Sequence, residues 1–159
     1  MALTTTITID QVAGSATGLI NSGVNIIEQK TYNLATNSLT FIVKDTFSIS
    51  VQDFIQLIAF SNNFNNQLIA SFNLNQFQFA PFSDVGIQLG VDDTNDGLNY
   101  LYAFPPFNDY IFQYSYNTGT GLFDLGSRDN AWVLSYPQYL YYLYTVNYFK
   151  SAIIATLLV

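Results

Sequence analysis

The sequence contains no cysteine and no histidine, and only 9% of its 159 residues are charged. Without cysteine, disulfides and thiolate metal sites cannot contribute. Without both residue types, the usual general bases and activated nucleophiles are missing, so paired carboxylates are the remaining route to catalysis. The carboxylates considered for that role all lie in predicted turns, where solvated carboxylates are expected: Asp84, Asp109, Asp124 and Asp129. We therefore expect no enzyme activity.

Positive charge is scarce, with four basic residues against eleven acidic ones and a net charge of -7. Nucleic-acid binding needs a dense basic footprint, and these four residues are scattered along the chain. The opening MALTTTITID lacks the basic and apolar regions of a secretory signal. We expect no nucleic-acid partner, and either no secretion by that route or a sequence that is already mature.

Half of the residues are hydrophobic and 17% are aromatic, so the polar surface must be built mainly from Asn, Gln, Ser and Thr. A surface of amides and hydroxyls offers little charge repulsion, which favours association with other chains. The length suits one domain over residues 1–159, because two comfortable cores would need more chain.

Most of the chain shows the alternation and turn spacing of β-strands. Strands are predicted at Leu3 to Ile9 (an edge strand), 25–33, 39–43, 47–51, 85–91, 98–104, 110–116, 122–125 and 131–135. Residues 13–23 are small and Gly-rich, so residues 1–23 are predicted to be an N-terminal arm. Turn signals every eight to twelve residues are typical of an all-β fold, and we predict an antiparallel, jelly-roll-like β-sandwich.

One short helix is predicted after Ser50, which can cap it while Asp53 lies three residues further on, as in a capping box. The amide cluster at residues 61–67 is predicted to end this helix. Near the C-terminus, 136–148 fits either a helix begun by Pro137 or two aromatic strands, and its composition favours strands. Residues 152–159 are apolar on both faces and predict a central strand.

The last twenty or so residues are the one candidate membrane span. Asn147 and Lys150 would lie near its middle, where a lysine costs about 2.5 to 3.5 kcal/mol. Membrane contact through the C-terminus is therefore not favoured.

The segment from Asp92 to Gly97 matches the opening of a calcium loop, with oxygen ligands at Asp92, Thr94 and Asp96. The position of the closing bidentate glutamate is occupied by Ala103. A hairpin turn explains the same residues, since Asp and Asn tolerate positive φ. We favour the turn and keep Ca²⁺ as the alternative; no other cofactor is expected.

The tyrosines exceed what one small core can bury while satisfying every hydroxyl. Interfaces are enriched in aromatics and depleted in Lys and Glu, so a subunit interface would explain the low charge and the apolar C-terminus together. A tyrosine-rich rim of a monomer and a sugar-binding surface are the alternatives. The predicted interface comprises Tyr139, Tyr141, Tyr142, Tyr144, Tyr148, Ile153, Ile154, Leu157 and Leu158.

In overall character the chain resembles coat, spike or tail proteins of archaeal viruses: rich in β-pattern, Asn, Gln, Tyr and Phe, and free of Cys. The resemblance covers composition and no specific motif. It implies a virion structural protein that packs against its own copies or other coat proteins. The first alternative is an extracellular filament or pilus subunit in which Leu3 to Ile9 completes the sheet of the next subunit. The second is a carbohydrate-binding module.

Overall fold

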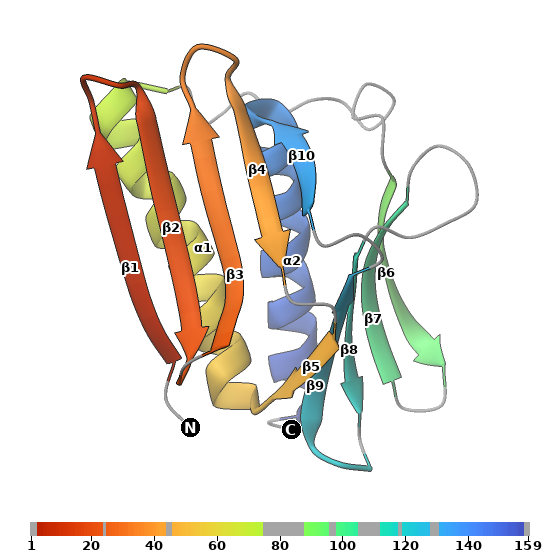
Figure 1. Cartoon of the computed structure of the whole chain (residues 1–159). Helices are drawn as coiled ribbons and strands as arrows, with labels where there is room; N and C mark the ends of the chain where they lie inside the picture. The colour runs from red at the N-terminus through yellow and green to blue at the C-terminus, as the bar shows by residue number, and fades with distance from the viewer. Residues whose placement is uncertain are drawn as a thin grey trace.

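The computed structural model describes residues 3–23, 25–43, 46–74, 88–95, 98–104, 112–117, 119–127 and 131–157. These residues form two five-stranded antiparallel sheets and two helices of 22 residues each (Figure 1). The prediction of antiparallel sheets is confirmed. The prediction of an all-β fold with one short helix is wrong.

The first sheet has the strand order β1-β2-β3-β4-β10 and the second has the order β5-β9-β8-β7-β6. The strands of the first sheet are β1 (Leu3–Asp10), β2 (Ser15–Ser22), β3 (Asn25–Asn33), β4 (Ser38–Val43) and β10 (Ala131–Ser135). Those of the second are β5 (Thr46–Ile49), β6 (Gln88–Asn95), β7 (Leu98–Phe104), β8 (Phe112–Asn117) and β9 (Leu122–Ser127). Most neighbouring strands are consecutive along the chain, which is a meander and not the Greek-key order of a jelly roll.

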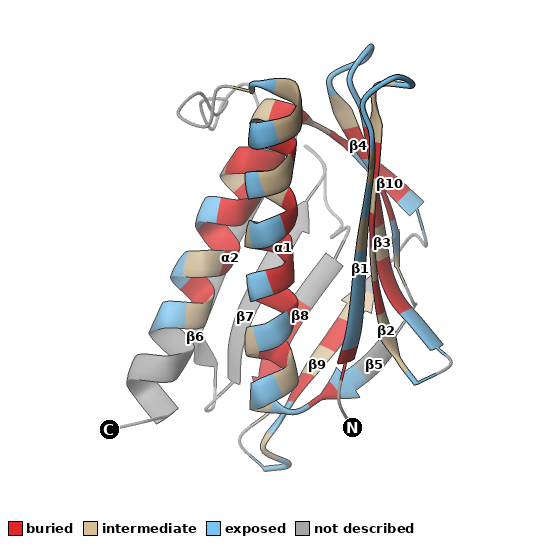
Figure 2. Cartoon of the chain, turned by 90° about the vertical axis from the view of Figure 1, so that its left-hand side faces the viewer, coloured by how far each residue is buried: buried red, intermediate tan, exposed pale blue. Residues whose placement is uncertain are grey.

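The helices α1 (Val51–Phe72) and α2 (Tyr136–Leu157) lie side by side on one face of the first sheet (Figures 1 and 2). Helix α1 packs against β1 and β2, whereas α2 packs against β4 and β10. Helix α2 also contacts β6 and β7, and α1 contacts β9. Both sheets therefore bury one face against the same pair of helices, and the core lies between these layers.

The predicted start of α1 is confirmed, since the Ser50 hydroxyl accepts a hydrogen bond from the Asp53 amide at 3.1 Å. The predicted end at residues 61–67 is wrong. Phe64 and Leu68 extend the buried stripe that starts at Phe54, and burying them outweighs the weak helix propensity of asparagine. The helix ends at Asn73, whose left-handed backbone (φ 54°) closes it.

Helix α2 replaces the aromatic strands favoured for residues 136–148 and the apolar strand predicted for 152–159. Tyr139, Tyr142, Val146 and Phe149 are all buried and recur every three or four residues, which is the period of a helix face. The strand propensity of aromatic residues reflects their packing on a sheet. Here the aromatic residues pack between a sheet and a second helix, and this packing determines that the segment is helical. Residues 158 and 159 lie outside the described part.

The predicted N-terminal arm is also wrong, because β1 and β2 are paired along their whole length, from Leu3 with Ser22 to Asp10 with Ser15. The glycine at position 18 of β2 is required by packing. A Cβ at Gly18 would lie 2.9 Å from atoms of the Phe60 and Phe64 rings, so the absence of a side chain at this position allows α1 to approach β2 closely.

Candidate functional site

A buried ion pair lies at the centre of the helix-facing side of the first sheet. Lys30 Nζ pairs with a carboxylate oxygen of Glu28, two residues away on the same face of β3. Lys30 is 0% exposed and Glu28 is 3% exposed. Lys30 Nζ also donates a hydrogen bond to Ser61 Oγ of α1 at 3.1 Å, and Ser61 Oγ donates to the Leu57 carbonyl at 3.2 Å. The pair thus ties the middle of β3 to the middle of α1.

Aromatic rings surround the ammonium group. Lys30 Nζ lies 5.4 Å from the centroid of Phe41 and 5.2 Å from that of Phe60, within the range of cation-π attraction. The Phe41 ring in turn stacks on Trp132 with a centroid distance of 4.1 Å. Burial lowers the pKa of Lys30 to about 7, because the charged amine has lost its water.

An amine with a lowered pKa beside a hydroxyl is a combination that can activate a nucleophile. Here both groups are covered, with Ser61 only 1% exposed, and the hydroxyl proton is already given to a main-chain carbonyl. No substrate can reach these atoms in this arrangement. The cluster therefore stabilises the contact between α1 and the sheet.

The buried tyrosines of α2 extend this polar interior. Tyr139 donates to the Ser61 carbonyl at 3.1 Å, and the hydroxyls of Tyr142 and Tyr114 lie 3.0 Å apart. Burial raises the pKa of Tyr114 to about 12, and the hydrogen bond from Tyr142 partly offsets this. Burial also raises the pKa of Tyr139 and Tyr142 well above 10.

The predicted tyrosine interface is therefore only partly at the surface. Tyr139 and Tyr142 are in the chain's own core, so their rings are not available to a partner, and that part of the prediction is corrected. Tyr144 and Tyr148 are exposed at 63% and 60%, and Tyr141 is half-buried. The remaining predicted residues stay a prediction: the backbone of Ile153, Ile154 and Leu157 is helical, their side chains are not described, and Leu158 lies outside the described part.

The outer face of the first sheet, opposite the helices, is a surface that the sequence analysis did not single out. Strand pairing aligns a row of five residues across it: Thr8, Thr17, Thr31, Thr40 and Val133. A second row contains Thr6, Leu19, Gln29, Ile42 and Ala131. Val133 and Ile42 are 62% and 46% exposed. Asp10, at one end of β1, is the one charged residue on this face among the described positions.

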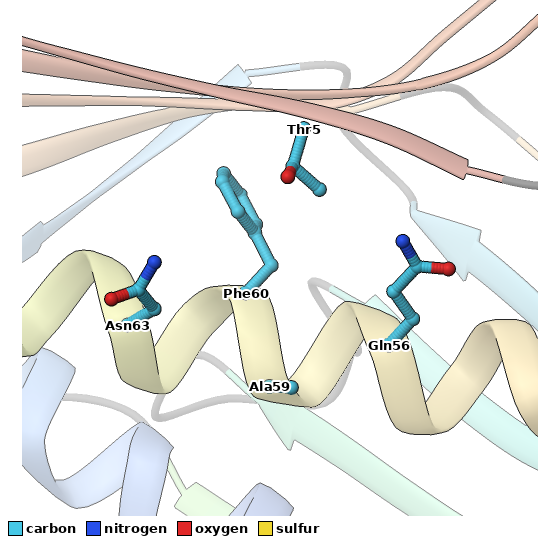
Figure 3. A pocket seen from close by; sticks show the side chains of 5 residues that line it. All are labelled: Thr5, Gln56, Ala59, Phe60 and Asn63. Carbon is cyan, nitrogen blue, oxygen red and sulfur yellow. The ribbon is translucent and has the colours of Figure 1, made fainter.

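A hollow of about 250 Å³ opens between β1 and α1. Thr5 points from the strand toward the helix, while Phe60, Gln56 and Asn63 point from the helix toward the strand, and Ala59 completes the lining (Figure 3). Gln56 Nε2 donates to the Leu3 carbonyl at 3.1 Å, so one main-chain oxygen of this strand is already satisfied.

The residues proposed for calcium are only partly described. Asp92 and Thr94 belong to β6, which pairs with β7, and the turn that contains Asp96 falls outside the described part. Among the described residues, no three His, Cys, Asp or Glu side chains gather in a way that would hold a metal. Calcium binding at this hairpin stays a prediction.

Of the carboxylates considered for catalysis, Asp124 lies in strand β9 and not in the predicted turn. Its carboxylate accepts a hydrogen bond from the Ser48 hydroxyl at 2.6 Å. Asp84, Asp109 and Asp129 lie outside the described residues. The expectation of no enzyme activity remains a prediction.

Comparison with known proteins identifies no relative. No family model matches the chain, and neither the curated proteins nor the solved structures contain a significant match. Within the described residues, neither helix combines the length and the apolarity that crossing a bilayer requires.

Proposed function

We propose that this protein is a structural subunit of a virion, acting as a coat, spike or tail component that packs against its own copies or other coat proteins. The two sheets and the helices they share would form one sandwich-like building block. The observation that carries this proposal is the outer face of the first sheet, which carries a single charge, Asp10, among the described residues.

That face differs from an ordinary solvent-exposed sheet. Five strands at about 4.8 Å make it about 20 to 25 Å wide, and five to nine residues at about 3.4 Å make it about 17 to 31 Å long. Val133 and Ile42 are exposed aliphatic side chains on it, and Asp10 is its one charge among the described residues. So little charge leaves little electrostatic repulsion against a second surface. Threonine and β-branched residues also suit packing against a second flat surface.

A filament built by strand donation is the less favoured alternative. Strand β1 is fully paired with β2 within its own chain, so donating it to a neighbour would first break that pairing. A carbohydrate-binding module is favoured by the hollow between β1 and α1, which combines an aromatic ring with two amides and a hydroxyl. It does not account for a sheet face with so little charge.

The test is the mass of the purified protein in solution over a concentration series, combined with electron micrographs. Val133→Lys and Ile42→Lys place charge on the outer face and should reduce association by at least about tenfold, since an unpaired buried charge costs several kcal/mol. The matched control is Val12→Lys, because Val12 is fully exposed in the turn after β1 and away from this face. A wild-type chain that stays monomeric at millimolar concentration would refute the proposal, as would equal effects of all three variants.

A further inference from the structure

The strand edges of the two sheets are unequally protected. Proteins usually block sheet edges with short strands, charges, proline or bulges. Strands β5 and β10 are short, with four and five residues. Strand β6 carries two aspartates and an irregular register between Asp92 and Asn95. Strand β1 has eight residues in unbroken register and no charge before Asp10.

Helix α1 adds a second uncharged strip beneath this edge. Its exposed residues recur every three or four positions and are all amides or alanines: Gln52, Gln56, Ala59, Asn63, Asn66 and Ala70. An exposed helix face normally carries Lys and Glu, which resist association. The stripe is about 27 Å long at 1.5 Å per residue. Seven strand residues at about 3.4 Å span about 24 Å, so the two strips match in length.

We propose that the edge of β1 pairs with the β1 edge of a second copy, around a two-fold axis that passes midway between the Thr6 residues of the two copies. This inference rests on the proposed function and names the surface through which two subunits meet. The first sheets of the two copies join into one ten-stranded antiparallel sheet, with the helices of both copies on the same side.

Of the two-fold registers, the one centred on Thr6 pairs the whole of residues 3–9 with itself, and it also satisfies side-chain alternation. Opposite residues of antiparallel strands share a face, so a continuous sheet requires each outward residue to face an outward residue. Centring on Thr6 places Thr6 opposite its own copy and Thr4 opposite Thr8 of the second copy, giving threonine pairs that favour strand pairing. On the inner side Thr5 meets Ile7 of the second copy, at the mouth of the hollow that Thr5 lines. Asp10 falls beyond the paired residues, so no like charges meet.

The expected contact is small. A strip about 25 Å long that spans a strand and the helix below it, with the two layers about 10 Å apart, lies at the low end of specific interfaces. We therefore expect a weak pair that an assembly reinforces, and the test must capture weak pairs.

Because the chain has no cysteine, single introduced thiols report the register directly. Thr6→Cys places two thiols opposite each other, with Cα atoms about 4.5 to 5.5 Å apart, inside the disulfide range of about 4.4 to 6.8 Å. The matched variant Thr8→Cys, on the same face of the same strand, places them about 14 Å apart. Thr120→Cys lies in the exposed turn between β8 and β9 of the second sheet, on neither the β1 edge nor the outer face of the first sheet, and reports random collision.

Under mild oxidation, Thr6→Cys should form disulfide dimers at least about tenfold faster than either control, since only there is the geometry met without movement. A mixture of Thr4→Cys and Thr8→Cys chains should form mixed dimers preferentially. Far-UV circular dichroism and urea unfolding check that each variant is folded. Equal rates at positions 6, 8 and 120 would overturn the proposal.

A charge variant gives a second readout in the absence of oxidant. Thr6→Lys sets two ammonium groups against each other across the axis and should weaken self-association more than Thr40→Lys, which adds the same charge to the outer face away from the axis. If Val133→Lys disrupts assembly while Thr6→Cys shows no selective cross-linking, the proposed function stands and the edge contact is wrong. If Thr6→Cys cross-links selectively while the outer-face variants change nothing, the edge contact stands and the sheet-face proposal fails.

Discussion

Replacing Lys30 by methionine tests whether the buried ion pair is as isolated from water as its surroundings indicate. Burial lowers the pKa of Lys30 from 10.5 to about 7, so the charged amine is disfavoured against the neutral amine by about 5 kcal/mol. Glu28 and the Ser61 hydroxyl are polar groups in contact with this amine. Lys30→Met leaves the Glu28 carboxylate buried without a counter-ion. Breaking a buried pair in this way costs about 3 to 5 kcal/mol, a fifth or more of a typical domain's stability.

Two companion variants make the result diagnostic. Glu28→Leu should be less costly at pH 9 than at pH 6, because the buried amine, with its pKa of about 7, is neutral at pH 9 and needs no counter-ion there. The double variant Glu28→Leu/Lys30→Met should recover most of the loss, since an apolar pair of similar volume is neutral or stabilising by about 1 to 4 kcal/mol.

Urea unfolding at pH 6 and pH 9, at constant ionic strength, measures all three free energies. The reasoning fails if Lys30→Met costs less than about 1 kcal/mol, which is the value of an exposed pair. It also fails if the double variant is as unstable as the sum of the two single variants, because a coupled pair must show an interaction energy.

The remaining predictions concern pH and packing. The pKa of Lys30 is lower in the folded chain than in the unfolded chain, so the unfolded chain binds more protons between about pH 7 and 10.5, and the free energy of unfolding should rise with pH through that window. Above about pH 10 the buried tyrosines, whose pKa is raised by folding, should reverse this trend. Urea unfolding at intervals of half a pH unit would locate the pH of maximum stability. Gly18→Ala should cost about 1 to 3 kcal/mol in urea unfolding, because its Cβ would meet two buried phenyl rings of α1 at 2.9 Å; a neutral result would show that α1 does not press on β2. The side-chain amides of Asn62 and Asn147 exchange two hydrogen bonds of 2.9 Å between the helices, so Asn62→Ala should lower the free energy of unfolding by about 1 to 3 kcal/mol. The control Asn66→Ala, on the exposed stripe of α1, should change thermal stability little.

The elements that the sequence predicts correctly are those with local signals. The Ser50 cap defines the start of α1, and the acidic turn between two alternating runs predicts the pairing of β6 with β7. The edge position of β1 follows from its threonine face and is confirmed. Each of these depends on residues within one or two turns of chain, so neighbours in sequence carry the information.

The elements that the sequence misses depend on partners far along the chain. Strand β2 resembles a flexible loop until Phe60 of α1 explains why Gly18 has no side chain. Helix α2 resembles strands until Phe41 and Trp132 of the first sheet provide the surface on which Tyr142 packs. Aromatic residues are compatible with either a helix or a strand, and the long-range contact with the first sheet determines which one forms.

The buried charges could have been suspected from one signal that we did not use. Glu28 and Lys30 lie two residues apart within a predicted strand, so they share a face, and the next residue on that face is Tyr32. In a chain with so few charges, two opposite ones at that spacing form a self-satisfying pair that can be buried. The uncharged residues that alternate with them along β3, Gln29 and Thr31, then lie on the outer face.

The charged pair of β3 is buried in the core, whereas the outer face of the same strand is uncharged, which is the reverse of the usual placement. This arrangement links the stability of the fold to its proposed role. A domain selected only to fold and stay dispersed would gain from an apolar pair in the core and lysines on the outer face. At Lys30 and at Thr31, adjacent positions of β3 that face opposite ways, the chain has the opposite arrangement: the cation is inside and the hydroxyl is outside. Moving the cation outward by one residue would place charge in the threonine row and an unpaired glutamate in the core. The same β3 register therefore keeps the inner pair satisfied and the outer face free of charge, which is the condition for that face to dock against another chain.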